Sequence, residues 1–479
     1  MKSKITSVVF PLIILLSFTF FMLFFSYSTS PVYPNFYGND SAFFRFMGLS
    51  LRKGKILYTD IWDNKGPVLF FIQALGTIGG VKNDKLSGIF VLQILSGFFS
   101  FFLMWQADKV LNTPNKEKLR FFSFMICAFT MIALFFEGGN CCEERCLPLI
   151  SMSLLLMTFY ASSTPKQTKH PLKFAFFHGI NLGLIAFIRI NNAISICAGV
   201  LVIGIYLIYN KQLKNLLLNI VFGFLGIAIV IIPIMLFFYK NDALTDMINA
   251  IFLHNLKYIS ARTYSNFNGM EILIRYAPLI ISMIMVLLHI VTIRQFHLID
   301  GLLLSMLSAN FIMLTNNNIY LHYFVIIIPL ITLVLSLTVK FSKKSEIILT
   351  LCLFIPFVYE SIKLIPTLYS NHVALPRYQS SALIPKNERS SSIAIWTPPD
   401  IYLHTGLEPC SRYCAYQDIH FGIDPSMKDE FIKTVLSAQP TWIIKPCGGP
   451  GVYSEIENLL AESYISQFSE LGLCFYRRE

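Results

Sequence analysis

The stretch YGNDSAFFRFMGLSLRKGKILYTDIWDNKGP, residues 37–67, stands between long apolar runs and decides how the rest of the chain is interpreted. It gathers polar and ionisable side chains, so an active site would be expected to begin here. Asp40 is predicted to be the N-cap of a helix from Ser41 to Lys53, and Gly54 to end it, because these residue types satisfy the free backbone groups of helix termini.

This predicted helix is amphipathic. Its apolar residues recur at helical spacing: Phe43, Phe44, Met47 and Leu51. Its basic residues are expected to reach lipid headgroups or water: Arg45, Arg52 and Lys53. The pattern is typical of a helix that lies flat at a membrane interface.

The composition indicates a polytopic membrane protein. Of the 479 residues, 55% are hydrophobic and only 14% are charged, and the apolar residues form long runs. The net charge of +11 does not indicate nucleic-acid binding, because the basic residues are spread over short loops instead of one soluble face. The first run, Ile5 to Tyr27, is longer than the core of a signal peptide and is interpreted as an uncleaved helix.

Eleven runs are long enough to be predicted spans. They are residues 5–27, 86–111, 120–136, 146–163, 172–188, 191–209, 215–239, 272–293, 297–314, 320–340 and 346–366. The run from Val68 to Val81 is too short, since 14 residues at 1.5 Å each cover about 21 Å of a core about 30 Å thick.

Loop charge then sets the predicted orientation. If residues 68–81 do not cross, basic residues fall in every later loop on the N-terminal side: Lys116, Lys118, Arg120, Lys166, Lys169, Lys173, Lys211, Lys214, Arg294, Lys340, Lys343 and Lys344. The positive-inside rule therefore places the N-terminus in the cytoplasm. It places four regions on the outer face: the loops 37–67, 137–145 and 240–271, and the C-terminus.

The predicted domains are a membrane domain, residues 1–368 with an outer loop 28–85, and an extracytoplasmic α/β domain, residues 369–479. In the second domain, strands are predicted at residues 393–396, 414–417, 441–445 and 473–478, and helices at 426–438 and 454–464. Gly448 to Gly451, GGPG, lacks the Lys-Ser/Thr of a phosphate loop and is interpreted as a turn.

Ten cysteines are present, and seven are expected outside the spans, where oxidation is permitted. A disulfide such as Cys410 with Cys414 is one pairing that this permits. Cys141, Cys142 and Cys146 are not interpreted as a metal site, because no His or second Cys pair stands nearby.

Ionisable residues are almost absent from the middle of the predicted spans. His178 comes nearest, and it is interpreted as a core histidine. The polar residues gather instead at the predicted outer rim: Asp40, Asp60, Asp63, Lys65, Glu137, Glu143, Glu144, Arg189, Asn191, Asn192, Tyr320 and His322. Because transport pathways place such residues inside the membrane, the pattern favours chemistry at the membrane surface.

Several motifs together resemble a known family. They are Asp40 with its amphipathic helix, GKILYTDIWDNKGP at residues 54–67, EERCLPL at 143–149, IRINN at 188–192 and HYFVIIIPL at 322–330. In this order they resemble the GT-C glycosyltransferases, which include the protein O-mannosyltransferases and the aminoarabinose transferase of lipid A. The resemblance implies a polytopic enzyme that uses a polyprenyl-phosphate sugar donor. The C-terminal strand and helix units, residues 369–479, also resemble the outer domain that many such enzymes carry.

The resemblance also assigns residues. Asp40 matches the acidic residue of the first loop, which implies a general base for the acceptor hydroxyl, and Lys65 matches the basic residue that meets the lipid-linked phosphate. Many relatives have a second acid where this chain has Ser41, so Asp60 or Asp63 would have to supply it. A divalent metal is left open, and no metal ligands are predicted.

Elementary chemistry supports these roles. Transfer from a lipid phosphate needs a base near the attacking hydroxyl and cations near the departing phosphate. Asp40 can supply the base, and Lys65 and Arg189 the cations, since a guanidinium matches phosphate oxygens. The further substrate-binding residues predicted are Asp60, Trp62, Asp63, Glu143, Asn192, His322 and Tyr323.

Structural roles compete with each assignment. Asp40 could serve only as a helix cap, Lys65 and Arg189 as headgroup anchors, and Trp62 as a residue of the interfacial aromatic belt.

The sequence thus predicts a membrane glycosyltransferase that moves a sugar from a polyprenyl-phosphate carrier to a lipid, glycan or protein at the outer face of a bacterial cytoplasmic membrane. A lipid or glycan transporter is one alternative, and a membrane scaffold for the outer α/β domain is another.

Overall fold

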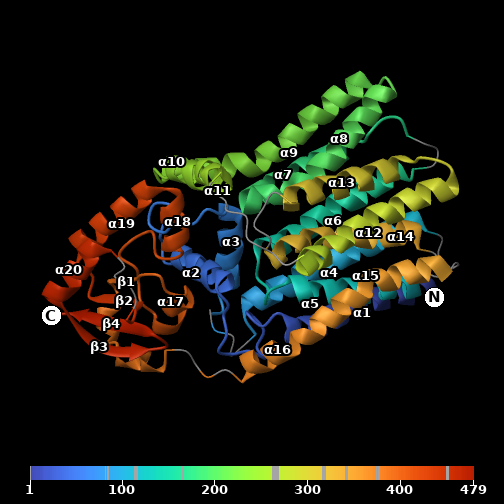
Figure 1. Cartoon of the computed structure of the whole chain (residues 1–479). Helices are drawn as coiled ribbons and strands as arrows, with labels where there is room; N and C mark the ends of the chain where they lie inside the picture. Colours follow the sequence, from blue (N-terminus) through green and yellow to red (C-terminus); the bar gives the residue numbers. More distant parts are fainter. Residues whose placement is uncertain are drawn as a thin grey trace. The chain divides into compact units, whose positions relative to one another are not determined.

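The computed structural model of the chain describes residues 2–80, 82, 86–112, 117–163, 167–260, 269–315, 320–339, 344–373, 375, 378–448 and 453–479. The chain forms two compact units (Figure 1). We call Met1–Ser26, Phe90–Ile234 and Thr263–Ser370 the helical unit, and Tyr27–Ile89, Met235–Arg262 and Asn371–Glu479 the mixed unit. The first loop and the C-terminal region therefore belong to the same compact unit.

Each predicted span coincides with a helix. These are α1 (Lys2–Phe25), α4 (Gly88–Leu111), α5 (Glu117–Phe135), α6 (Cys142–Ala161), α7 (Leu172–Arg189), α8 (Ile194–Tyr209), α9 (Leu213–Lys240), α12 (Gly269–Ile293), α13 (Leu298–Thr315), η3 (Leu321–Ile327) continuing into α14 (Ile328–Thr338), and α15 (Lys344–Lys363). A further helix, α16 (Ile365–His372), follows. The prediction of a polytopic helical fold is confirmed.

Six segments of the described chain are long and apolar enough to cross a membrane by length and composition. One of them, Leu172–Tyr209, covers two predicted spans, because the short 3₁₀ turn η1 (Ile190–Ala193) separates α7 from α8. The number of crossings and their direction stay predictions. Of the basic loop residues, Lys116, Lys166, Lys340 and Lys343 lie outside the described residues.

Burial differs strongly between the spans. In the segment Leu321–Thr338, 78% of the spanning window is buried inside the protein, against 11% in Leu213–Lys240. The segment η3–α14 packs against α5, α6, α12 and α13 and forms the centre of the helical unit. Helix α9 instead leaves most of its apolar side chains on the surface, as a lipid-facing helix does.

In the mixed unit, the first loop folds into α2 (Asp40–Arg52) and α3 (Pro67–Gly76), which pack against each other. At their crossing, a Cβ on Gly48 would come within 2.6 Å of the backbone of Gln73, so a glycine is required for the close approach. Helix α3 has only 10 residues, in agreement with the expectation that this run does not span.

Two expectations about α2 are wrong. Asn39 is the N-cap, although its side chain makes no capping bond, and Asp40 is the first helical residue. Arg45 does not reach headgroups or water: its side chain is buried, donates to the carbonyl oxygen of Ser28 and stacks over Tyr37. A backbone carbonyl and an aromatic ring can hold a guanidinium in a buried place where the sequence pattern suggests solvent.

The rest of the mixed unit is α/β. Its helices are α10 (Leu244–Ile248), the π-helical η2 (Asn249–Leu253), α11 (His254–Ser260), the 3₁₀ turns η4 (Gln379–Leu383) and η5 (Lys386–Glu388), α17 (Asp400–Thr405), α18 (Gln417–Ile423), α19 (Pro425–Ala438) and α20 (Ser454–Ser463). Its strands are β1 (Ser392–Ala394), β2 (Trp442–Pro446), β3 (Tyr464–Glu470) and β4 (Leu473–Arg478), in the order β1-β2-β4-β3. Only β1 and β2 pair in parallel.

The strand predicted at residues 414–417 is wrong, and β3 was missed. Tyr416 has a left-handed φ of 53°, and the helix α18 starts at the next residue, so the short apolar run did not specify a strand. Strand β3 lies at the sheet edge with mostly exposed side chains, which leaves little alternation to detect. Residues 449–451 of the predicted GGPG turn lie outside the described residues.

The disulfide also differs from the expected pairing. Cys447 and Cys474 are bonded, and Cys410 and Cys414 are both free. The bonded cysteines stand near the end of β2 and the start of β4, which pair antiparallel with Lys445 opposite Cys474. Strand register, which spacing along the sequence does not reveal, brings the two sulfurs within reach.

Candidate functional site

Asp40 is held by a residue far along the chain. The hydroxyl of Tyr416 donates a hydrogen bond to Asp40 Oδ1 at 2.7 Å, across 376 residues. Asp40 is half-buried at the start of α2. Tyr416 reaches it from a left-handed backbone conformation that residues other than glycine adopt only where their surroundings impose it.

Asp63 and Lys65 lie in the turn that leads into α3. Asp63 Oδ1 accepts a hydrogen bond from the backbone N–H of Lys65 at 2.8 Å, and Lys65 Nζ lies 3.5 Å from the same oxygen. The buried hydroxyl of Tyr58 donates to the carbonyl oxygen of Lys65 at 2.8 Å. The turn is therefore tied at both residues, which limits where the ammonium group of Lys65 can point.

The electrostatics couple these groups. Burial raises the pKa of Asp63; Lys65 partly opposes this rise and the charge of Asp40 adds to it. Burial also raises the pKa of Tyr416 well above its ordinary value, and the nearby carboxylates of Asp40 and Asp63 raise it further. Tyr416 therefore stays protonated at neutral pH and donates to Asp40. We call Asp40, Asp63, Lys65 and Tyr416 the Asp40 cluster.

Replacement of Tyr416 by Phe should reveal this coupling. The variant removes the hydrogen bond to Asp40 and keeps the ring, so we expect about a 10- to 150-fold lower transfer rate, the size of one hydrogen bond to a charged group. The carboxylate loses a donor that stabilises its charged form, so the acid limb of the rate profile should move to higher pH. A profile that does not move would contradict the coupling. Tyr413→Phe, which removes a hydroxyl bonded instead to Glu430, is the matched control.

Trp62 lies in a cage of aromatic side chains. Its ring is 8% exposed and packs edge-on against His254 and His420, with Tyr413 beside it. His254 Nε2 and His420 Nδ1 are 3.1 Å apart, which joins α11 to α18. The structure thus gives Trp62 a packing role in this cage.

The histidine pair predicts a pH dependence of stability. Burial lowers the pKa of His254 to about 4 and that of His420 well below its ordinary value. Protonation is easier in the unfolded chain, so the stability that the neutral rings supply is present above about pH 6.5 and is lost as the pH falls from there toward 4. We expect a melting temperature about 2–4 °C lower at pH 5 than at pH 8, measured in detergent.

A matched pair of variants tests this assignment. His254→Gln keeps a hydrogen-bonding side chain that does not titrate, so it should flatten the slope between pH 8 and 5. His297→Gln, at an exposed position, should leave the slope as it is. The assignment would be wrong if both variants kept the full slope.

Asp60 lies apart from the Asp40 cluster. Its Oδ2 accepts from the backbone N–H of Ile56 at 2.7 Å, and its side chain lines a polar groove that Lys55, Arg412 and Glu430 also line. The lining of that groove does not include Asp40, Asp63 or Lys65. Of these two acids, Asp63 is the one on whose pKa the charge of Asp40 acts.

In the helical unit, Arg189 is the centre of a second group. The break between α7 and α8 puts Arg189 in an extended conformation, and its guanidinium forms an ion pair with Glu143. The same guanidinium stacks over the ring of Tyr323 with its carbon 3.9 Å from the ring centre. We call Glu143, Arg189 and Tyr323 the Arg189 cluster. Glu143 is 1% exposed, whereas the side chain of Arg189 is 19% exposed.

The neighbouring residues extend this cluster. His322 pairs with Glu137 and packs edge-on against Tyr323, with ring centres 4.8 Å apart. Asn192 is not part of the group: it is buried and its amide donates to Cys146 Sγ at 3.4 Å. Among the residues that the structure describes, no group of three or more His, Cys, Asp or Glu side chains is arranged to hold a metal ion.

A polar network that was not predicted supports the loop before α6. Glu144 Oε2 accepts from Gln93 Nε2 at 3.0 Å and from the backbone N–H of Asn140 at 2.8 Å, and Arg145 donates to Asn140 Oδ1 at 2.8 Å. Residues 137–140 all have positive φ, and two of the four are glycines. The two adjacent glycines in EGGN are the sequence signal that could have predicted this tight loop. No such signal near Tyr416 could have predicted its contact with Asp40.

The sequence matches no protein family model and no curated protein. The structure is similar to ArnT from Cupriavidus metallidurans bound to undecaprenyl phosphate, with a TM-score of 0.63 and 12% identity over 97% of each chain.

It is also similar to the oligosaccharyltransferase of Archaeoglobus fulgidus. The apo form gives a TM-score of 0.50 at 10% identity, over 91% of this chain and 69% of that one. The form tethered to an acceptor peptide with the NVT sequon gives 0.51 at 11% identity, over 98% and 74%. The chain therefore shares the fold of ArnT and of this oligosaccharyltransferase, in agreement with the fold that its resemblance to the GT-C glycosyltransferases implied.

Proposed function

We propose that this protein is an integral membrane glycosyltransferase. It transfers one sugar from a polyprenyl-phosphate-linked donor to a lipid, glycan or protein acceptor on the outer face of a bacterial cytoplasmic membrane. The observation that carries this proposal is the Asp40 cluster: a half-buried carboxylate held by a tyrosine hydroxyl, with a lysine and a second carboxyl group beside it, on a chain with the GT-C fold.

The reaction assigned to the site exchanges one carbon–oxygen bond for another and moves one proton. The bond between the anomeric carbon of the sugar and the phosphate oxygen breaks, and its electron pair leaves with the lipid phosphate. The acceptor oxygen forms the new bond to the anomeric carbon, and its proton passes to Asp40. Tyr416 donates a hydrogen bond to Asp40 Oδ1, which holds the carboxylate in place for this proton transfer.

The cations act on the leaving group. Charge grows on the phosphate as the bond breaks, so a positive group positioned beforehand stabilises the transition state. Lys65 is assigned to this role because its turn is tied through Asp63 and Tyr58. Arg189 is assigned as the second cation, with Tyr323 and Glu143 holding its planar guanidinium. The leaving phosphate already carries its charge, so no general acid is required.

The donor class has two supports. The structure of ArnT, which has the same fold, contains undecaprenyl phosphate, and the chain presents cations and a carboxylate suited to a sugar on a lipid phosphate. The acceptor is proposed only by class. The distribution of Lys and Arg in the loops supports a cytoplasmic N-terminus. With that orientation, the loop of residues 28–85 in the membrane domain lies on the outer face, and the domain of residues 369–479 is extracytoplasmic.

Donor consumption tests the proposal. Purified protein in lipid nanodiscs would be mixed with undecaprenyl-phosphate-linked sugars and an extract of envelope acceptors, and the released undecaprenyl phosphate measured by mass spectrometry. We expect release that depends on both donor and acceptor. Movement of the donor lipid between leaflets without cleavage would support a transporter instead and would overturn the proposal.

A further inference from the structure

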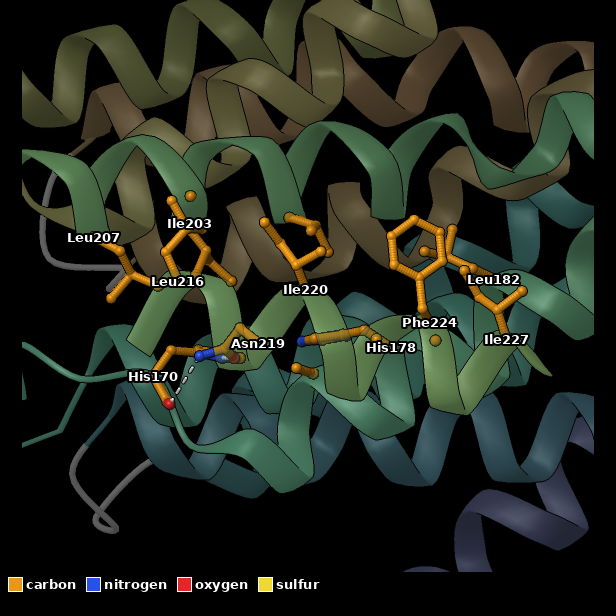
Figure 2. Close-up of a pocket in the computed structure, with 15 residues that line it drawn as sticks. His170, His178, Leu182, Ile203, Leu207, Leu216, Asn219, Ile220, Phe224 and Ile227 are labelled. Atoms are coloured by element: carbon orange, nitrogen blue, oxygen red, sulfur yellow. Dashed lines mark hydrogen bonds between the residues drawn. The ribbon is translucent and has the colours of Figure 1, made fainter. Parts of the chain in front are cut away.

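A separate cavity lies between α7, α8 and α9 of the helical unit. Its volume is about 200 Å³. It is lined mostly by aliphatic and aromatic side chains and glycines, with three polar residues: His170, His178 and Asn219 (Figure 2). His178 stands 11 residues before Arg189 on α7, which is about 16 Å along the helix. The cavity is therefore remote from the Arg189 cluster and has no part in the proposed reaction.

Helix packing explains the cavity. Helices α7 and α9 touch through glycines, since a Cβ on Gly179 would collide with the backbone of Gly223 and one on Gly226 with that of Phe176. Helix α8 does not close on α9 in the same way: a Cβ on Gly204 would meet only Leu216 within 4 Å, at 3.7 Å. The gap between α8 and the glycine-packed pair is the cavity.

The hydrogen bonds of Asn219 define the state of His170. Asn219 Nδ2 donates to the carbonyl oxygens of Asn215, at 2.8 Å, and His170, at 3.3 Å, so Oδ1 is its acceptor. His170 Nδ1 lies 2.5 Å from that oxygen and must donate to it. Burial lowers the pKa of His170, so the ring is neutral at pH 7 and its Nε2 carries a lone pair.

Buried nitrogens face this cavity without a protein partner. His170 Nε2 and both ring nitrogens of His178 make no hydrogen bond to any residue that the structure describes. The side chains of His170 and His178 are 3% and 2% exposed, and their ring centres are 6.0 Å apart. Leaving a buried polar group unpaired costs about 1–3 kcal/mol, so these nitrogens indicate a ligand.

The lining and the nitrogens together define the chemistry of that ligand. The lining around the rings is apolar and suits a hydrocarbon chain, and several neighbouring side chains on α8 and α9 face lipid. One hydroxyl oxygen about 2.8 Å from a nitrogen of each ring would fit rings 6.0 Å apart. A hydroxyl can donate to His170 Nε2 and pair with a nitrogen of His178 at the same time.

We propose that this cavity binds a membrane lipid whose headgroup carries an uncharged hydroxyl, with the chain along α8 and α9 and the hydroxyl between His170 and His178. The site lies near the helix ends that also carry Lys169, Lys173 and Lys211, which is the predicted cytoplasmic end. The lipid therefore enters from the leaflet opposite to the proposed reaction.

Native mass spectrometry of the full purified chain tests this. The probes are mono-oleoylglycerol, which has free hydroxyls, and methyl oleate, which has the same chain and none. We expect the protein to bind mono-oleoylglycerol about 5-fold more tightly, the size of one or two neutral hydrogen bonds. His178→Leu should remove this preference and keep the chain site. Equal binding of the two probes by the unmodified protein would overturn the proposal.

Two variants of α8 distinguish the cavity from the general lipid surface. Gly204→Phe places a ring toward Leu216 and should abolish the saturable site for both probes. Leu201→Phe changes an exposed position of the same helix that does not line the cavity and should bind both probes normally. Normal binding by Gly204→Phe would overturn the assignment, and if that variant does not fold, the result with His178→Leu decides.

Discussion

Replacement of Asp40 by Asn is expected to lower the rate of sugar transfer by about 10²- to 10⁴-fold, the usual contribution of a general base. The substitution removes the proton acceptor with little change of shape. Asn Oδ1 can still accept the hydrogen bond from Tyr416, so α2 and its contacts should remain. The rate is measured as release of the polyprenyl phosphate at saturating donor, with the melting temperature recorded to show that the variant is folded.

Asp60→Asn is the control for Asp40→Asn. Asp60 is a carboxylate of the same loop, but it is exposed and lines the polar groove that Lys55 and Arg412 also line. We expect the transfer rate of the Asp60→Asn variant to stay within about 3-fold of that of the unmodified protein, as for a surface substitution away from the reacting groups. Normal transfer by a folded Asp40→Asn protein would remove Asp40 from the mechanism, and equal losses in both variants would point to a general effect of loop charge.

Arg189→Met is expected to have the largest effect on stability. Glu143 is 1% exposed, and the guanidinium of Arg189 is its ion-pair partner, so the variant leaves a buried carboxylate uncompensated. Breaking such a pair costs about 3–5 kcal/mol, which denaturant unfolding in detergent would show. Transfer should also fall strongly, because the proposed phosphate contact is lost.

The double variant Arg189→Met with Glu143→Leu separates the two effects. Replacing both members of a buried ion pair by apolar residues is often neutral for stability, so the free energy of unfolding should recover. Transfer should remain low, because no cation has been restored. If the double variant also regains transfer, Arg189 serves only to neutralise Glu143, and the phosphate role assigned to it is wrong.

The long apolar runs made the helices of the helical unit predictable. The length of an apolar run can be read from the local sequence, and the thickness of the hydrocarbon core sets how long a spanning helix must be. The predicted spans therefore coincide with helices, and the short α3 was recognised as too short. The same local signals failed in the C-terminal region, where the edge strand β3 and the helix α18 have no clear periodicity.

For the site, sequence reasoning named the side chains to which we assign the reaction, but not their partners. Asp40, Lys65 and Arg189 stood out because ionisable residues are scarce in such an apolar chain. The roles of Tyr416, Tyr58 and the histidine pair were missed, since tyrosine and histidine are common in soluble segments and carry no signal there. The exposure of Arg45 was predicted wrongly, because a basic residue on an amphipathic helix is normally exposed and this one is buried.

The sequence by itself determined the membrane class, the positions of the helices of the helical unit and the first loop as the place where charged groups gather, because composition and periodicity are properties of neighbouring residues. Only the tertiary structure decided that Tyr416 holds Asp40, that Cys447 pairs with Cys474, and that three ring nitrogens of His170 and His178 have no partner among the described residues. Those contacts join residues distant in sequence, and packing brings them together only when the chain is folded.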